Sequence, residues 1–422
     1  MINTQQQFNN APFPILISVK ITSRKMNKLH AHLNNSSLAS GIAVAAFAAT
    51  FAAVAIGTSR RNRKKESDFE AQVKPILVPP TQIYTPNELE VQKRCWDERN
   101  PEGRFLKERH GYTHFVLDGL ENGPSKKGLI VVIHGVGENS KNPKEFSDCI
   151  VHNGFAVLRY DFYGHGYSKY GGNDPWFKYT PDMLVDQLED VLEYVLEETK
   201  ERVVALVGHS TGGVVCIKAN ERWANNGAKR GVVSKIILLA PCLYADKPLI
   251  ARIADLMPAT FTACAKNVSI IRILAENAYV DAAKESFGRD PDTKEIIYPE
   301  AQCKEVLQIE RVLAKQPFYL PSIFSINSYA LRGDMLHSHR ESFLSVLKRQ
   351  NGQRAEILYL WGSLDTLVPF DKCHQEIQVL EHQYDNLTFS PLGYLGHKMF
   401  QEDSTALAGR VIPFINQYAA SY

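Results

Sequence analysis

One serine of this chain stands in a sequence context that favours nucleophilic catalysis. Ser210 is the centre of Gly-His-Ser-Thr-Gly, which directly follows the apolar run 203–207 and precedes a stretch of helical character. A β-branched run that ends in Gly-x-Ser-x-Gly predicts a sharp turn from a strand into a helix, called a nucleophile elbow. Small residues at both ends of the motif let the backbones approach closely. We therefore predict that Ser210 is a nucleophile.

A carboxylate and a histidine follow this serine in the order that a catalytic triad needs on such a scaffold. Asp365 comes directly after the apolar strand candidate 356–361, and His397 lies in a glycine-rich loop near the C-terminus. A serine hydroxyl is a weak nucleophile until a base takes its proton, so we assign His397 as that base. Asp365 would fix the tautomer of the imidazole and stabilise the imidazolium. Two alternatives stay open: Asp365 could be a helix N-cap, and Asp371 could supply the acid.

Acyl transfer also needs hydrogen-bond donors for a developing oxyanion. A second strand candidate, 129–133, runs into His-Gly-Val-Gly at 134–137. A loop in this position usually donates one backbone N–H, and the residue after the nucleophile donates the second. We assign these donors to Val136 and Thr211. Loss of one such donor typically costs roughly 100- to 1000-fold in rate.

Three further histidines lie within these motifs or close to them. We interpret His134, His165 and His209 as loop-shaping residues whose ring nitrogens satisfy nearby backbone groups. His397 differs from them because it comes last in the chain, after the acid, in a loop flanked by glycine.

Three segments taken together resemble the successive motifs of one enzyme family. They are 134–138 (HGVGE), 161–168 (DFYGHGYS) and 208–213 (GHSTGG). These motifs are similar to those of the monoacylglycerol-lipase-like serine hydrolases, also called the serine aminopeptidase S33 family, over roughly residues 100–420. The resemblance implies an α/β-hydrolase fold with a cap. It also implies an esterase or lipase activity on acyl glycerols, lysophospholipids or similar esters.

The functional positions of that family can be carried onto this chain. Its nucleophile, acid and base fall on Ser210, Asp365 and His397, and its oxyanion donors fall on Val136 and Thr211. The chain departs from the family pattern in an inserted segment, where such enzymes normally set their specificity. The resemblance therefore leaves the substrate open.

The distribution of apolar runs predicts an α/β fold. Strand candidates alternate with helical patterns such as 182–198, which favours a mostly parallel sheet with helices on both faces. The segment 105–117 is expected to form two antiparallel edge strands. With 422 residues, the chain is long enough for a catalytic domain, an insertion and a tail. The strand candidates are 129–133, 156–161, 203–207, 234–241, 356–361 and 387–390.

The N-terminal part of the chain has a different composition. Residues 38–57 contain no charge, and nine of these twenty residues are Ala. A helix of that length spans about 30 Å of hydrocarbon. A cleaved signal peptide is less favoured because 37 residues precede the stretch, and an organellar presequence stays as an alternative. The expected parts are a basic leader (1–37), a transmembrane anchor (38–58), a linker (59–100) and an α/β-hydrolase domain (101–422) with a cap insertion at about 243–350.

Charges around this anchor predict its orientation. Five Lys or Arg lie within 60–65, against four spread over 20–28. The positive-inside rule therefore places the catalytic domain in the cytosol. A stripe of small residues along the anchor would let two copies pack as a homodimer, although a segment so rich in Ala and Gly produces such stripes by composition alone. The stripe consists of Gly41, Ala45, Ala49, Ala53 and Gly57.

Composition argues against several other classes of protein. Nine basic residues and no acid lie in 1–65, which leaves 39 basic and 46 acidic residues for the remainder. A domain that acidic is not expected to bind nucleic acid. The seven cysteines include no Cys-x-x-Cys pair, so neither a disulfide framework nor a zinc site is indicated. We expect no cofactor and no metal.

The sequence therefore predicts a membrane-anchored serine hydrolase. Its expected substrates are carboxylic esters of lipids, such as monoacylglycerols or lysophospholipids, cleaved through an acyl-serine intermediate. An enzyme tethered beside a bilayer is well placed for esters that partition into it. One alternative is a short-chain carboxylesterase or an amidase or peptidase that acts on small soluble substrates. A second is a non-catalytic binding protein on a hydrolase scaffold, which the complete set of Ser210, Asp365 and His397 argues against.

Overall fold

The structure is a computed structural model in which every described residue belongs to one unit, residues 64–422. The predicted leader 1–37 and anchor 38–58 lie outside the described residues. No helix within the described part is long and apolar enough to cross a bilayer. The described residues are 74–86, 102–171, 179–225, 233–243, 333–349 and 354–417, with single residues and short pieces between 280 and 326.

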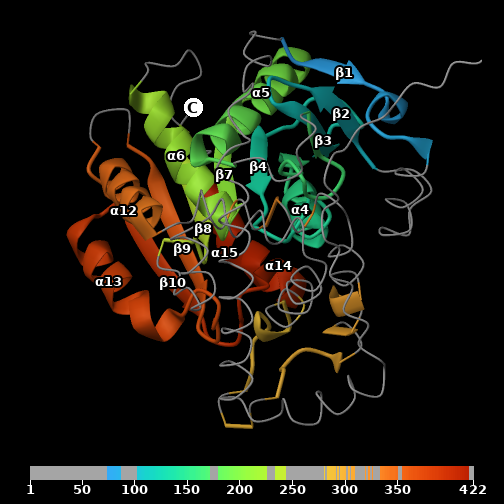
Figure 1. The fold of residues 1–422 in the computed structure, drawn as a ribbon. Coiled ribbons are helices and arrows are strands. Elements are labelled where there is room, and N and C mark those ends of the chain that lie inside the picture. The colour runs from blue at the N-terminus through green and yellow to red at the C-terminus, as the bar shows by residue number, and fades with distance from the viewer. Residues whose placement is uncertain are drawn as a thin grey trace, which may run out of the picture. The chain divides into compact units, whose positions relative to one another are not determined.

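A ten-stranded sheet forms the centre of the described structure (Figure 1). Nine strands follow the order β1-β2-β3-β5-β4-β7-β8-β9-β10, and β6 pairs with β3. The strands from β5 to β10 along this order are parallel, and those from β1 to β3 are antiparallel, which confirms the predicted mostly parallel sheet. The strands are β1 (Ile76–Val78), β2 (Arg104–Lys107), β3 (Gly111–Asp118), β4 (Leu129–Ile133), β5 (Ala156–Tyr160), β6 (Lys169–Tyr170), β7 (Val203–His209), β8 (Lys235–Leu239), β9 (Glu356–Gly362) and β10 (Leu387–Leu392).

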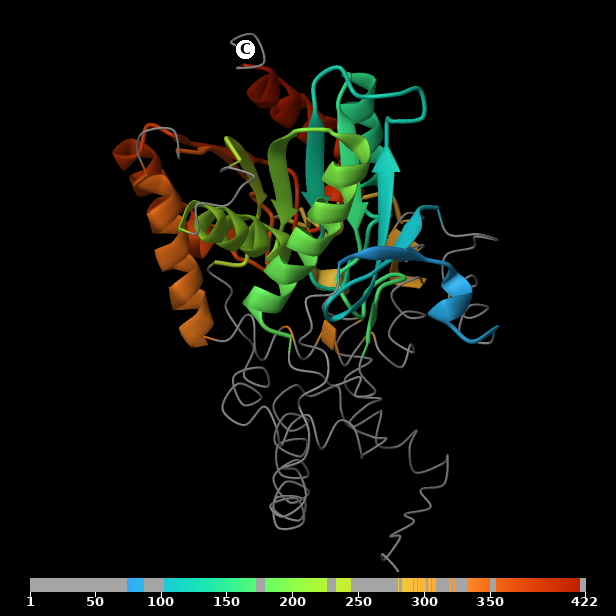
Figure 2. The ribbon, with the colours of Figure 1, turned by 90° about the horizontal axis from the view of Figure 1, so that it is seen from above.

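Helices cover both faces of the sheet, as predicted (Figure 2). α5, α6 and α12 pack in a row on one face, whereas α4 and α15 pack against each other on the other. The central strands β4, β5 and β8 are buried along their whole length, because a strand covered on both faces has no solvent side. The helices are α4 (Lys144–His152), α5 (Pro181–Thr199), α6 (Thr211–Asn225), α12 (Gly333–Leu347), α13 (Phe370–Gln383), α14 (Met399–Glu402) and α15 (Ser404–Asn416), with a short 3₁₀ helix η1 (Pro80–Gln82).

The structure differs from two of the predicted boundaries. Part of the predicted linker 59–100 belongs to the fold: β1 pairs with β2 and takes the sheet edge that had been assigned to 105–117. The predicted cap insertion at 243–350 extends too far, because α12 is not part of a cap. It packs on α6, and its Phe343 and Val346 belong to the main core. The physical reason is that α12 supplies the crossover from β8 to the parallel strand β9.

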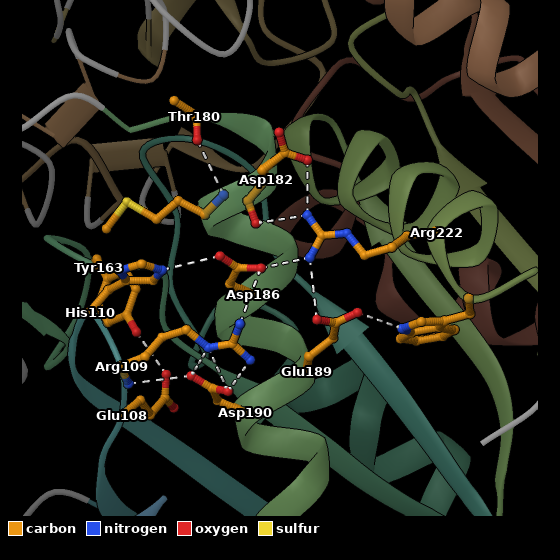
Figure 3. Close-up of polar contacts among 12 residues, drawn as sticks. Glu108, Arg109, His110, Tyr163, Thr180, Asp182, Asp186, Glu189, Asp190 and Arg222 are labelled. Carbon is orange, nitrogen blue, oxygen red and sulfur yellow. Dashed lines mark hydrogen bonds and ion pairs between the residues drawn. The ribbon is translucent and has the colours of Figure 1, made fainter. Parts of the chain in front are cut away.

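A polar network fastens α5 to the turn before β3 and to α6 (Figure 3). The guanidinium of Arg109 donates to both carboxylate oxygens of Asp190, with an Nη2–Oδ1 distance of 2.6 Å. Arg222 of α6 donates to Asp186 Oδ1 at 2.6 Å and to Glu189 Oε2 at 3.2 Å. These bonds join elements that are far apart in the sequence, so the network braces one end of the helical layer.

The same network reaches the 161–168 motif through one buried contact. The hydroxyl of Tyr163 donates to Glu108 Oε2 at 2.7 Å (Figure 3). Burial and the neighbouring charge of Asp190 raise the pKa of Glu108 well above its ordinary value. The pair therefore holds the motif against the turn between β2 and β3.

Candidate active site

Ser210 lies at the turn between β7 and α6, as the elbow motif predicts. Its φ of 51° lies in the left-handed region, which non-glycine residues rarely adopt. The strained turn is held in place because Ser210 N donates to Leu239 O of β8 at 2.9 Å. The side chain sits above the carboxyl end of the parallel sheet, the edge at which ligands of such folds bind.

Close backbone approaches explain two glycines around this serine. A Cβ at Gly212 would lie 2.3 Å from the carbonyl oxygen of Ile133, so only glycine lets α6 begin against the end of β4. A Cβ at Gly135 would lie 2.9 Å from the Cβ of Ser210. The loop that follows β4 is therefore packed directly against the serine.

Asp365 and His397 form a buried pair. Asp365 follows β9 and His397 follows β10, and the Nδ1 of His397 lies 2.7 Å from Asp365 Oδ2. The other oxygen, Oδ1, accepts from Leu367 N and Val368 N, each at 2.9 Å. A carboxylate that holds Nδ1–H leaves the Nε2 of a neutral imidazole without a proton and able to act as a base.

The structure also bears on the two alternatives for the acid. α13 begins at Phe370 with Pro369 as its N-cap, so Asp365 does not cap that helix; it caps the preceding turn. Asp371 lies in the first turn of α13 and is exposed. Within the described residues, the carboxylate in contact with His397 is that of Asp365.

Backbone contacts hold the loop that carries His397. The N–H of His397 donates to the carbonyl oxygen of Ser286 at 2.8 Å. The buried carboxylate of Glu402 accepts from Gly396 N at 2.5 Å and from Gly288 N at 3.0 Å. Burial raises the pKa of Glu402 to about 7, although the two N–H donors oppose this shift. Glu402 therefore ties the histidine loop to the segment 283–290.

The serine and the histidine are not joined by a hydrogen bond in the described structure. His397 is nevertheless next to the elbow, because its ring centroid lies 4.8 Å from that of His209, the neighbour of Ser210. Catalytic hydrogen bonds are often long in the absence of substrate. The contact between Ser210 Oγ and His397 is accordingly part of the function proposed below.

The two residues assigned as oxyanion donors flank the serine. Val136 lies in the loop after β4, next to Gly135, whose Cα faces Ser210. Thr211 is the first residue of α6, and the first amides of a helix have no acceptor within it. The backbone N–H of Thr211 therefore has no acceptor within its own helix, and the use of Val136 and Thr211 as oxyanion donors stays a prediction.

The three histidines that we interpreted as loop-shaping make different contacts in the structure. His134 satisfies backbone on both sides: Phe162 N donates to its Nε2 at 3.0 Å, and its Nδ1 lies 2.7 Å from Gly135 O. His165 contacts Tyr163 O at 3.3 Å, and burial lowers its pKa to about 3. For His209 the interpretation is incomplete, because its ring also contacts the carboxylate of Glu138 at 2.7 Å.

Sequence analysis missed two residues of this site, Glu138 and Glu402. Glu138 is the last residue of the 134–138 motif. Its position three residues after Gly135 could have indicated that its carboxylate accepts a hydrogen bond from the loop backbone. Glu402 carries no local signal, because its partners Gly396 and Gly288 come from distant segments. In the described part of the chain, no group of His, Cys, Asp and Glu is arranged to hold a metal ion.

One family model matches a part of this chain that includes Ser210. Residues 124–312 match the family model described as Serine aminopeptidase, S33. The matched residues make up less than half of the chain, and the parallel sheet and the elbow described above have the arrangement of an α/β-hydrolase fold. This match is consistent with the family suspected from the sequence motifs, and no curated protein sequence matches the chain.

Solved structures share the α/β-hydrolase fold with this chain. An enol-lactonase from Burkholderia xenovorans LB400 is 17% identical, with a TM-score of 0.52 over 72% of this chain and 96% of that one. An α/β-hydrolase enzyme from a Medee basin deep-sea metagenome library is 15% identical, with a TM-score of 0.54 over 74% and 97%. A thermophilic esterase from Thermogutta terrifontis is 14% identical, with a TM-score of 0.51 over 75% and 95%. At such identities the likeness establishes the fold alone.

Proposed function

We propose that this α/β-hydrolase is a serine hydrolase that cleaves carboxylic esters through an acyl intermediate on Ser210. The observation that carries the proposal is the buried Asp365–His397 contact of 2.7 Å beside the strained elbow. A neutral imidazole oriented by a carboxylate next to a serine on a strained turn is the arrangement that serine activation needs.

The reaction follows from the roles of these groups. His397 Nε2 takes the proton of Ser210 Oγ while the oxygen attacks the ester carbonyl. The N–H groups of Val136 and Thr211 stabilise the negative oxygen of the tetrahedral intermediate. His397 then gives the proton to the departing alcohol, which leaves an acyl-serine. Water attacks this ester with His397 again as base, and Ser210 recovers its proton as the carboxylic acid leaves.

Covalent labelling tests this function directly. A fluorophosphonate probe phosphonylates an activated serine, so the wild-type chain should be labelled and Ser210→Ala should not. Ser363→Ala is a matched control, because Ser363 lies in the loop of Asp365 without a role in the reaction, and its labelling should equal that of wild type. Labelling that persists in a folded Ser210→Ala protein would rule out Ser210 as the nucleophile.

The surroundings of Val136 support an apolar acyl group in the substrate. Val136 packs against a second apolar cluster, to which both the N-terminal segment and the cap region contribute. Tyr319 of the cap region donates its hydroxyl to Gly137 O at 2.6 Å, so this part of the cap lies on the oxyanion loop. The cluster consists of Ile83, Tyr84, Phe105, Tyr167, Tyr319 and Ile323.

We therefore extend the proposal to lipid esters, such as monoacylglycerols or lysophospholipids. Hydrolysis of p-nitrophenyl esters with acyl chains from acetyl to palmitoyl should give kcat/KM values that rise with chain length. A preference for acetyl or butyryl esters would instead support a short-chain esterase. Amide analogues of the best ester serve as the control for peptidase or amidase activity.

A membrane anchor at 38–58, with the catalytic domain in the cytosol, is the second part of this proposal. It rests on the uncharged, Ala-rich composition of that segment and on the basic residues 60–65. The full chain should resist extraction from membranes by alkaline carbonate, and a chain without 38–58 should be released. Release of the full chain would contradict the anchor without affecting the enzymatic part of the proposal.

A further inference from the structure

The site contains a buried charged pair that the reaction above does not use. Glu138 follows the oxyanion loop and His209 precedes the nucleophile, and their side chains are 5% and 1% exposed. His209 Nδ1 lies 2.7 Å from Glu138 Oε2, and its Nε2 lies 2.7 Å from the carbonyl oxygen of His397. One imidazole ring therefore contacts both the first and the last of the three loops around the serine.

Hydrogen-bond chemistry fixes the protonation of this ring. A backbone carbonyl oxygen only accepts, so the Nε2 of His209 must carry a proton and donate it to His397 O. Glu138 Oε2 also accepts from Gly135 N at 2.8 Å, and Glu138 Oε1 accepts from Gln401 Nε2 at 3.4 Å. A carboxyl group surrounded by donors is ionised, and an ionised carboxylate requires a proton on Nδ1 as well. Both ring nitrogens then donate, which makes His209 an imidazolium.

The charges that face the pair are consistent with this state. Burial alone would lower the pKa of His209, but the charge and hydrogen bond of Glu138 outweigh burial and raise it. Burial likewise opposes ionisation of Glu138, yet the neighbouring His209 and Lys398 hold its pKa well below the ordinary value. Asp365 adds a second negative charge near His209, and His134 is a further titratable group beside the pair.

We propose that Glu138 and His209 are positioning residues whose buried carboxylate–imidazolium pair fixes the backbone of His397 relative to Ser210 and to the oxyanion loop. Glu138 holds the loop through Gly135 N, and His209 belongs to the elbow itself. The Nε2–H of His209 donates to the backbone carbonyl of His397, and this bond sets the distance between the His397 ring and Ser210. The catalytic part of this inference rests on the serine-hydrolase function proposed above; the charge state of the pair does not.

Nuclear magnetic resonance measures that charge state without any substrate. In the full chain labelled with ¹⁵N-histidine, one ring should keep protons on both nitrogens at pH 8, where ordinary histidines are neutral. This signal should disappear in His209→Asn, which assigns it. In Glu138→Gln the same ring should lose one proton, because the amide no longer stabilises the positive charge. A wild-type His209 ring with one bare nitrogen at pH 8 would overturn the inference.

Kinetics measure the positioning role. In Glu138→Gln, kcat should fall by about 10- to 100-fold, since small displacements of catalytic groups have effects of this size. KM should stay near the wild-type value, because Glu138 is buried away from substrate. Asp186→Asn is the matched control: it alters a His–carboxylate contact on α5, His110 Nε2–Asp186 Oδ2 at 3.1 Å, and should leave kcat unchanged.

The two measurements separate this inference from the proposed function. If the wild-type chain hydrolyses no ester but still shows the doubly protonated His209 ring, the hydrolase function is contradicted and the carboxylate–imidazolium pair is supported. A reactive chain whose Glu138→Gln variant is folded and retains full kcat would overturn the positioning role. If Glu138→Gln does not fold, the wild-type resonance at pH 8 still decides the charge state.

Discussion

At the scale of single residues, the site depends on Asp365, whose two carboxylate oxygens both accept hydrogen bonds. Asp365 uses one oxygen for two backbone N–H groups and the other for His397. Such a carboxylate cannot rotate without breaking three hydrogen bonds, so the imidazole is held in one tautomer. These three partners compensate the buried carboxylate for the water that it has lost.

Replacement of this acid should test its role. Asp365→Asn keeps the shape of the side chain but favours the wrong tautomer of His397. We expect kcat to fall by about 1,000- to 10,000-fold, the size of effect seen when the acid of a comparable triad is amidated. Steady-state hydrolysis of the best p-nitrophenyl ester measures it, and Asp371→Asn on the neighbouring helix should behave as wild type. Equal losses in both variants would contradict the assignment.

The approach of Gly135 to the serine gives a second residue-level prediction. In Gly135→Ala the added methyl would meet Ser210 Cβ at 2.9 Å, so the loop or the elbow must shift. A displacement of this kind should lower kcat/KM by about 100-fold. Gly409→Ala in α15 is the control, since nothing lies within 4 Å of the added Cβ. That substitution should leave activity unchanged and increase thermal stability, because alanine favours a helix.

At the scale of elements, parallel strands bring the site together. β4, β7, β9 and β10 run in the same direction, so the loops that follow them meet at one edge of the sheet. The loops are then tied to one another by buried carboxylates: Glu138 joins the loops after β4 and β7, and Glu402 joins the histidine loop to 283–290. Strand order brings these loops together, and the carboxylates fix their geometry.

The raised pKa of Glu402 makes stability depend on pH. The folded protein keeps this proton up to about pH 7, whereas the unfolded chain releases it near 4.5. Between these values the folded state binds more protons, so the free energy of unfolding decreases as pH rises. The contribution that is lost amounts to about 3 kcal/mol. The wild type should therefore lose stability relative to Glu402→Gln between pH 4.5 and 7.5, as measured by urea unfolding. If the free energies of unfolding of the two proteins change with pH in parallel, the raised pKa of Glu402 is contradicted.

At the scale of the whole molecule, the segment that precedes β2 is part of the catalytic unit. β1 extends the sheet, and Ile83 and Tyr84 are buried against Phe105 and the cap region. The hydroxyl of Tyr84 donates to the carbonyl oxygen of Tyr167, beside the 161–168 motif. The described part of the predicted linker, residues 74–86, thus contacts the 161–168 motif.

Truncations should locate the start of the catalytic unit. A chain that begins after residue 73 keeps this segment, and its thermal midpoint and esterase activity should match those of the full chain. A chain that begins after residue 86 exposes the side chains that Ile83 and Tyr84 cover. Burial of two such side chains stabilises by about 3–6 kcal/mol, so its midpoint should fall. Equal midpoints for the two truncated chains would show that the segment does not stabilise the fold.

The sequence alone determined the parallel strands of the sheet, the elbow and the chain order of Ser210, Asp365 and His397. Each of these depends on local patterns: apolar runs long enough to be buried, and glycines where backbones must approach. Only the tertiary structure decided that Glu138, His209 and Glu402 support the site, and that β1 belongs to the sheet. Their partners lie far away along the chain, and a buried polar contact between distant segments leaves no periodic pattern in a single sequence.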